Sequence, residues 1–527
     1  MKSLFVKYLL CLALVVWLGI PLLRANNPQI SQVALVNQNA IQNFIHLRFS
    51  VAWENSWRTS TGPANWDAIW LFVKFRRAGT TTWGHATLST SGHVVPMNAT
   101  TATPSDGKGT FLYRNADGTG NVNFNPVELR WNYGLDGVSD TDSLEVQVHG
   151  IEMVYIPQGS FYLGDGEVTD LYGNFEEGNS GLPYQVTSES GIALGGSNPN
   201  GLGNNNRQGQ FGAPACTGDG CLTGSGDDFD DVTSQTLPPA FPKGFAPFYI
   251  MKYEMTQQQF VDMLNKCTPA QQAFLTQSGH FYPNLGAAQG LRYGISTSPP
   301  YTTTNVYTPM IFLDWMRGAA YADWSGLRPM TELEFEKACR GPLNPVAGEY
   351  PWGNPNIALN LNLTLSDMNL PYESISSGYD NSGVNGNCWV RAGGHTMPTV
   401  ARVGIFAASF SNTGRVTSGG SYYGVMEMGG NAWERAVSVG HPDGRSFTGT
   451  HGDGLLHADG YANEQWPGID FQGRVSSNIG VGYRGGGLSY PNPNLQHNAR
   501  ISSRRVSSSY WNAVIEDDGN RFVRNEP

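Results

Sequence analysis

The sequence predicts an α+β, loop-rich chain whose N-terminal part is an all-β sandwich domain. Charged residues make up only 14% of the 527 residues, whereas glycine occurs 65 times, and this balance is typical of tight turns rather than long helices. Strand patterns follow one another from residue 32 to residue 150, and helical spacing appears only beyond them. At this length, two domains are expected.

The first residues predict a signal peptide over residues 1–25. Lys2 and Lys7 precede an apolar run over residues 8–23, which is short for a membrane span, and cleavage is expected after Ala25. An uncleaved anchor is the alternative, because Arg24 follows the run. We therefore expect a secreted or extracytoplasmic protein, in the periplasm or at the cell surface, with no membrane span after cleavage. The net charge of −11 and the lack of a basic run argue against a nucleic-acid partner.

Residues 26–150 are expected to form the β-sandwich domain. Residues 44–53, 127–131 and 144–148 alternate between apolar and polar side chains, and residues 68–75 form a nearly continuous apolar run. Five tryptophans of this region either form a carbohydrate-stacking platform or belong to the core, and the core is favoured: Trp53, Trp57, Trp66, Trp70 and Trp83. No activity is assigned to this domain.

Residues 151–527 are expected to form the second domain. It opens with two strands around Pro157, and a Gly- and Asn-rich insertion follows at about 165–241. Within the insertion, Cys216 and Cys221 are a candidate disulfide. Later, Thr256 is expected to cap a helix, and Thr331 with Glu334 has the spacing of a capping box.

A motif at residues 424–435 predicts a calcium site. Asn431 and Glu434 carry oxygen atoms three residues apart, and the carbonyl groups of Gly430 and Ala432 complete a ligand set that suits a hard cation. In the alternative, Asn431 caps a turn and Trp433 is part of the core.

Within this motif, residues 430–434, together with residues 423–428 before them, resemble the "GLYDMxGNxWEW" signature of the formylglycine-generating enzyme (sulfatase-modifying factor) family. Further phrases that resemble this family follow in its order: residues 153–164, 248–256, 326–341, 350–354, 482–487, 498–505 and 519–524. The resemblance implies a divergent C-type-lectin-like fold for the second domain and a buried structural role for Glu254. It also implies a further calcium loop, for which Asn360 or Asn362, together with Asp380, are the candidates.

The resemblance breaks where the family has its catalytic cysteines. In formylglycine-generating enzymes, two thiolates after the "RGGS" phrase hold copper, and thiolate is the kind of ligand that Cu(I) requires. Residues 488–527 contain no cysteine. Copper-dependent formylglycine generation is therefore not expected. We expect instead a non-catalytic pseudoenzyme that acts in binding or surface assembly.

Two further hypotheses concern ligands. Other branches of the family are named as non-haem iron enzymes, and an iron-dependent oxidoreductase remains the alternative function, with His451, Asp453 and His457 as its candidate ligands. The binding hypothesis places a recognition surface for an unknown cell-surface protein or glycan near the C-terminus, because its composition resembles that of recognition loops: Tyr490, Asn492, Asn494, His497, Tyr510 and Trp511. Four arginines that match the family's positions only in part are expected to be internal salt-bridge partners: Arg500, Arg504, Arg505 and Arg521.

Overall fold

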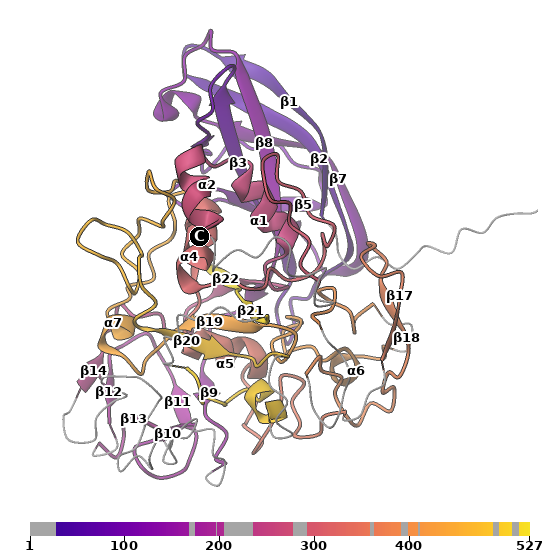
Figure 1. Cartoon of the computed structure of the whole chain (residues 1–527), viewed down its shortest axis with the longest axis vertical. Helices are drawn as coiled ribbons and strands as arrows, with labels where there is room; N and C mark the ends of the chain where they lie inside the picture. Colours follow the sequence, from indigo (N-terminus) through magenta and orange to yellow (C-terminus); the bar gives the residue numbers. More distant parts are fainter. Residues whose placement is uncertain are drawn as a thin grey trace, which may run out of the picture.

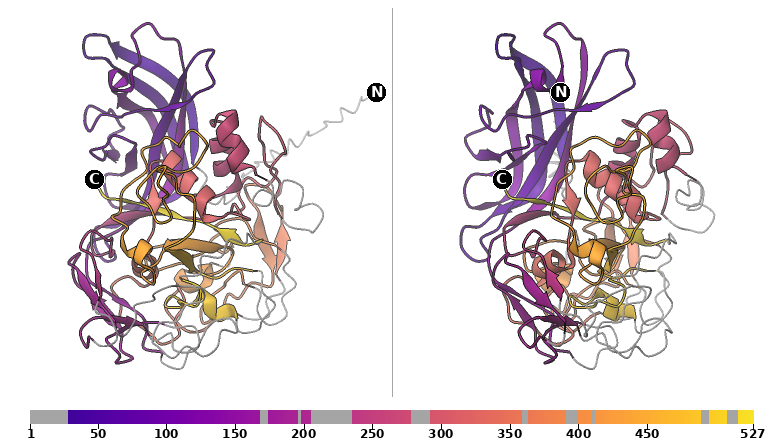
Figure 2. Two further views of the ribbon diagram at one scale, coloured as in Figure 1. Left: turned by 60° about the vertical axis from the view of Figure 1, so that its left-hand side comes forward. Right: turned by 90° about the vertical axis from the view of Figure 1, so that its left-hand side faces the viewer.

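The computed structural model describes residues 28–167, 174–195, 198–204, 235–277, 292–358, 363–390, 399–408, 412–488, 495–507 and 516–527. It is mostly sheet, with short helices and long loops in the second half (Figures 1 and 2). The N-terminal elements are β1 (Gln29–Asn39), β2 (Phe44–Arg58), β3 (Asp67–Arg77), β4 (Gly84–His85), β5 (Ala99–Ala102), β6 (Thr110–Arg114), β7 (Gly118–Trp131), η1 (Tyr133–Asp136) and β8 (Leu144–Ile156).

Two sheets enclose the core of the N-terminal region. One has the strand order β1-β2-β7, and the other contains β8, β3, β6 and β5. The alternation along β2 points Leu47, Phe49, Val51 and Trp53 inward, where they meet the apolar side chains of β3 and β7. The four segments predicted as strands from their sequence patterns fall within β2, β3, β7 and β8.

The larger sheet runs through both regions of the chain. Its order is β16-β22-β15-β8-β3-β6-β5, so strands from the C-terminal half pair with strands of the N-terminal region. β8 pairs with β3 from Leu144 to Val154, and its last four residues, Met153 to Ile156, pair with β15. The domain boundary expected at residue 150 thus lies inside β8.

The second region holds short strands, helices and loops. Its strands are β9 (Phe161–Leu163), β10 (Phe175–Glu177), β11 (Tyr184–Val186), β12 (Ile192–Leu194), β13 (Leu202–Asn204), β14 (Gln235–Leu237), β15 (Phe248–Met251), β16 (Arg328–Pro329), β17 (Thr364–Ser366), β18 (Ser374–Ser377), β19 (Trp433–Val437), β20 (Val481–Arg484), β21 (Asp518–Gly519) and β22 (Phe522–Asn525). Its helices are α1 (Gln257–Leu264), α2 (Pro269–Leu275), α4 (Trp315–Trp324), α5 (Glu332–Arg340), α6 (Arg415–Ser418), α7 (Pro442–Arg445) and the 3-10 helix η2 (Leu495–Ala499).

Side-chain caps fix where the helices begin. Thr256 caps α1 and Thr331 caps α5 in a capping box with Glu334, as the sequence predicts, and Thr256 forms a capping box with Gln259 as well. The caps satisfy amide groups that have no partner within the helix. The caps therefore set the first residues of α1 and α5, which follow β15 and β16 along the chain.

Buried polar contacts join the N-terminal region to the rest of the chain. The indole nitrogen of Trp70 donates to the carbonyl oxygen of Ser325 at 2.9 Å. The amine of Lys74 donates to the carbonyl oxygens of Trp324 and Gly454, each at 2.6 Å. Because these groups are buried, separation of the two regions would leave them without partners. The two regions therefore form one packed body.

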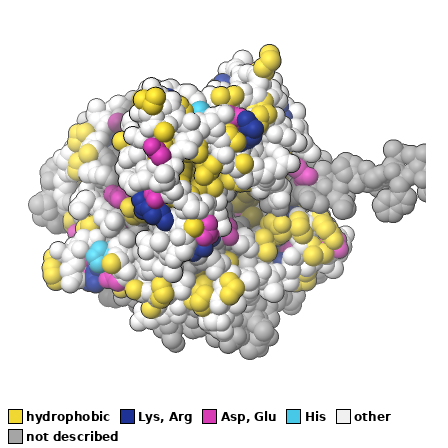
Figure 3. All heavy atoms as spheres, turned by 90° about the horizontal axis from the view of Figure 1, so that it is seen from above, with side chains coloured by type: hydrophobic (Ala, Val, Ile, Leu, Met, Phe, Trp, Pro, Cys, Tyr) yellow, Lys and Arg dark blue, Asp and Glu magenta, His cyan; other side chains and the backbone are white. Residues whose placement is uncertain are grey.

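The outer surface carries few charges. Seen from the end that bears the N-terminal strands, Lys and Arg side chains are scattered among apolar and uncharged groups (Figure 3). Within the described ranges, no helix combines the length and the apolar character needed to cross a bilayer.

Candidate functional site

The calcium motif lies in a tight turn that leads into β19. Gly430 and Asn431 both have a positive φ, of 84° and 65°. A Cβ atom at Gly430 would lie 2.7 Å from the sulfur of Cys388, so this position also requires glycine for space. The turn places Asn431, Ala432 and Glu434 in the interior, each with no exposed surface.

Both polar side-chain atoms of Asn431 form hydrogen bonds within the protein. Its side-chain oxygen accepts a hydrogen bond from the amide of Ala401 at 2.9 Å, and its side-chain nitrogen donates to Glu254 at 2.6 Å. The amide of Ala432 donates to the other oxygen of Glu254 at 2.8 Å. Glu254 is thus the buried acceptor that its motif implies.

Glu434 forms a buried ion pair with Arg521. Its Oε1 lies 2.6 Å from a guanidinium nitrogen, and the pair has no exposed side-chain surface. Arg521 also donates to the carbonyl oxygens of Met251, Lys252 and Met426. Oε2 of Glu434 is buried and has no hydrogen-bond partner among the described residues. An unsatisfied buried carboxylate oxygen suits a cation, but Arg521 already supplies one positive charge to the same group.

Glu427 is a site residue that the sequence analysis missed. It lies three residues before Gly430, with a φ of 49°, and both of its carboxylate oxygens accept from the amide of Gly404. Burial raises the pKa of Glu427 to about 7, although Arg521 and Arg402 oppose the shift. The sequence feature that could have identified Glu427 is an acidic side chain inside the motif at residues 424–435.

Three carboxylates therefore share this buried region. Burial raises the pKa of Glu254 well above its ordinary value, and the charges of Glu427 and Glu434 raise it further. Burial likewise raises the pKa of Glu434, against the opposing effect of Arg521. Such a set holds either protons or a cation, because three buried like charges are costly. Calcium ligation by Gly430, Asn431, Ala432 and Glu434 stays a prediction.

The candidate iron ligands have separate partners. Nε2 of His451 accepts from the amide of Asn525 at 3.1 Å, and Nδ1 of His457 lies 2.5 Å from a carboxylate oxygen of Asp459. Asp453 instead lies with two other carboxylates, Asp323 and Glu464, whose oxygens are all within 4.8 Å of one another. Among the described residues, Asp453 therefore lies in a group of carboxylates and not in a common ligand group with His451 and His457.

Several other predicted site residues fall outside the described ranges. They are Cys216, Cys221, Asn360, Asn362, Tyr490, Asn492, Asn494, Tyr510 and Trp511. Asp380 is described, and its carboxylate accepts from the amide of Ser382 and the side chain of Asn385 within one turn. His497 is half-buried in η2.

The three described cysteines are buried thiols. Burial raises the pKa of Cys267 to about 12 and that of Cys339 and Cys388 well above the ordinary value. The thiol of Cys388 donates at 3.1 Å to the carbonyl oxygen of Gly429, which belongs to the motif at residues 424–435. Such buried thiols are protonated at neutral pH unless a nearby positive charge or a metal stabilises the thiolate.

A network of buried ion pairs holds the layers around the motif. Glu332 on α5 accepts from Arg504 at 2.9 Å and from Arg484 on β20 at 3.1 Å. Glu336 on the same helix lies 2.7 Å from Arg484. The expected internal pairing of Arg504 and Arg521 is confirmed. Paired buried charges fix the relative position of α5, β20 and the C-terminal segment.

Comparison with known proteins identifies the family. Residues 218–481 match the sequence profile of the Sulfatase-modifying factor enzyme 1-like domain, which is half of the chain. A curated formylglycine-generating enzyme from Thermomonospora curvata is 26% identical over 151 residues, which cover 24% of this chain and 48% of that enzyme. The chain thus spans about half the length of this relative. The matched segment contains α1, α5 and the motif that leads into β19, and the chain belongs to the sulfatase-modifying factor family.

Proposed function

We propose that this protein is a non-catalytic member of its family, secreted or held at the cell surface, which acts in binding or surface assembly. The observation that carries the proposal is the lack of any cysteine between Leu488 and Pro527, where formylglycine-generating enzymes have their copper ligands. The apolar N-terminal run supports the location.

The buried charges support a scaffold role. Glu332, Arg484 and Arg504 are fully buried and are used for internal pairing. A rigid framework of this kind, of the C-type-lectin-like class, holds surface loops in fixed positions, and such loops are where binding residues concentrate.

We propose calcium as the structural cofactor of this scaffold. Calcium would contact Oε2 of Glu434, the side-chain oxygen of Asn431 and the carbonyl groups of Gly430 and Ala432, with Glu427 as an additional carboxylate in the same buried region. Its charge would offset the three buried carboxylates, so that they remain ionised at neutral pH. Arg521 contributes only part of that positive charge.

Elemental analysis together with an activity assay tests the proposal. The full chain is purified without chelator, analysed for calcium, copper and iron, and then incubated with Cu(I), oxygen and a cysteine-containing sulfatase peptide. A formylglycine-generating enzyme serves as the positive control. We expect about one calcium per chain and no formylglycine in the peptide. Stoichiometric copper or iron, or peptide conversion, would overturn the non-catalytic assignment, and stoichiometric iron would favour the alternative of an iron-dependent oxidoreductase.

A further inference from the structure

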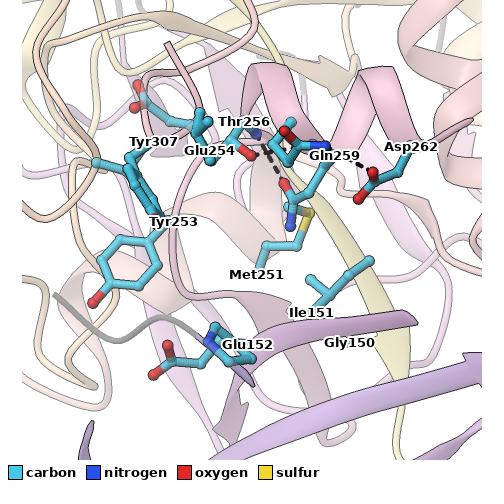
Figure 4. Close-up of a pocket in the computed structure, with 14 residues that line it drawn as sticks. Gly150, Ile151, Glu152, Met251, Tyr253, Glu254, Thr256, Gln259, Asp262 and Tyr307 are labelled. Carbon is cyan, nitrogen blue, oxygen red and sulfur yellow. Dashed lines mark hydrogen bonds between the residues drawn. The ribbon is translucent and has the colours of Figure 1, made fainter. Parts of the chain in front are cut away.

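A cleft lies between β8 and α1, where the N-terminal region meets the rest of the chain. It consists of two adjoining cavities of about 180 Å³ each, which share the lining residues Pro28, Gly150, Ile151, Gln259 and Asp262. Figure 4 shows Gln259 and Met251 between the strand and the helix, with Asp262 at one end and Tyr253 and Glu152 at the other. The calcium motif does not line the cleft.

The described lining of the cleft is acidic. It includes the carboxylates of Glu152, Glu254 and Asp262, and neither a lysine nor an arginine is among its lining residues. Glu152 is paired with Lys252 at 2.8 Å, and Glu254 is bonded to Asn431. These two carboxylates are therefore already used within the protein.

Asp262 is the carboxylate that is left for a ligand. One of its oxygens accepts from the side chain of Gln258 on the same helix at 2.8 Å. The neighbouring cation, Lys266, places its amine over the ring of Trp83 at 4.9 Å, and no ion pair joins Lys266 to Asp262 in the part of the chain that the structure describes. Burial raises the pKa of Asp262, although the hydrogen bond from Gln258 and the nearby charge of Lys266 oppose the shift, and a cation in direct contact would stabilise the ionised form further.

His149 adds a neutral acceptor to the same cavity. Its ring stacks on Phe72, with 5.1 Å between the ring centres, and meets the edge of Trp324 at the same distance. Burial lowers the pKa of His149 to about 3, and the charges of Lys266 and Lys74 lower it further. Nε2 is buried and has no hydrogen-bond partner among the described residues. A neutral imidazole has one nitrogen that accepts a hydrogen bond.

Aromatic rings complete the surroundings. Tyr321 and Trp324 line the cavity that holds His149, and Tyr253 and Tyr307 line the other. The faces of aromatic rings attract organic cations and pack against alkyl chains. The cleft thus combines the carboxylate of Asp262, which has no ion pair among the described residues, one neutral acceptor and several aromatic rings.

We propose that this cleft binds a primary ammonium group on an unbranched alkyl chain. The ammonium group lies between the carboxylate of Asp262 and the imidazole of His149, and the alkyl chain follows the aromatic walls. The same chemistry is offered by a free alkylamine and by a lysine side chain of a partner protein. This inference goes beyond the proposed function and does not depend on calcium.

Titration calorimetry on the full chain tests the proposal. The probes are n-butylammonium for a free amine, Nα-acetyl-lysine methylamide for a lysine side chain, and n-butanol as the uncharged control. We expect saturable binding of at least one ammonium probe and much weaker binding of n-butanol. Binding of both ammonium probes points to a partner lysine, and binding of n-butylammonium alone points to a free amine. Failure of both, or equal binding of n-butanol, overturns the proposal.

Variants assign the binding to the cleft. Asp262→Asn is expected to lower the affinity for the ammonium probe by about tenfold or more, because the bound ammonium group loses its counter-charge. Glu145→Gln is the matched control, since Glu145 lies on β8 but is exposed and paired with Arg76. His149→Phe keeps an aromatic ring and removes the acceptor, and weaker binding is expected here too. Unchanged affinity in Asp262→Asn, in protein shown by thermal unfolding to be folded, contradicts the proposal.

Discussion

The carboxylate of Glu434 and the guanidinium of Arg521 form a fully buried ion pair, with 2.6 Å between nitrogen and oxygen. Arg521 ties this carboxylate to the carbonyl groups of Met251, Lys252 and Met426. The motif at residues 424–435 is therefore held in place by the C-terminal segment through contacts within the protein.

Glu434→Gln is expected to destabilise the protein both with calcium and in chelator. The loss is roughly 3–5 kcal/mol, because Arg521 keeps its buried charge without its direct partner. If calcium binds here, the wild type gains thermal stability on calcium addition and the variant does not. Thermal unfolding with and without chelator measures both effects. An identical calcium-induced shift in the variant would contradict calcium ligation by Glu434.

Glu332→Gln is expected to cost a similar amount, roughly 3–5 kcal/mol, for a related reason. Glu332 accepts from Arg504, Arg484 and the amide of Val439, and all three partners are buried. After this substitution, the buried guanidinium groups of Arg504 and Arg484 have less negative charge close to them. Glu145→Gln breaks only the exposed pair with Arg76 and is expected to cost less than about 1 kcal/mol. Denaturant unfolding of the two variants gives the comparison, and equal losses would contradict it.

Local patterns in the sequence predicted local structure well. The strand segments, the caps at Thr256 and Thr331, and the buried role of Glu254 all follow from neighbouring residues or from a single motif. Capping and alternation are short-range effects, so a few residues are enough to specify them.

Contacts between distant residues could not be predicted in the same way. Expecting Arg521 in some internal pair was reasonable, but nothing in the sequence selected Glu434 as its partner, 87 positions away. The continuation of β8 into a sheet with β15 depends on strand pairing, which alternation alone does not specify. The cleft beside Asp262 likewise exists only because α1 packs beside β8.

The stability of the protein is expected to depend on pH through Asp165. Burial raises the pKa of Asp165 to about 6, even though its carboxylate accepts from the amides of Glu167 and Gly348. Because the folded state then binds this proton more tightly than the unfolded state, stability falls as pH rises from about 4 through about 6. Asp165→Asn should flatten this part of the pH profile by roughly 1–3 kcal/mol. Denaturant unfolding at several pH values measures it, and an unchanged slope would count against the raised pKa.

The two regions of the chain are expected to unfold together. β8 pairs with β3 from Leu144 to Val154 and with β15 from Met153 to Ile156, so a chain that begins at residue 151 lacks β3, the strand partner of residues 151–154. It also exposes the surface that Trp70 and Lys74 cover, where the carbonyl groups of Trp324 and Ser325 would lose their donors. Calorimetry should therefore show one cooperative transition for the full chain and none for the fragment, whereas a chain that begins at Pro28 should melt like the full chain. Two separate transitions, one of them reproduced by the fragment, would show instead that the regions are independent folding units.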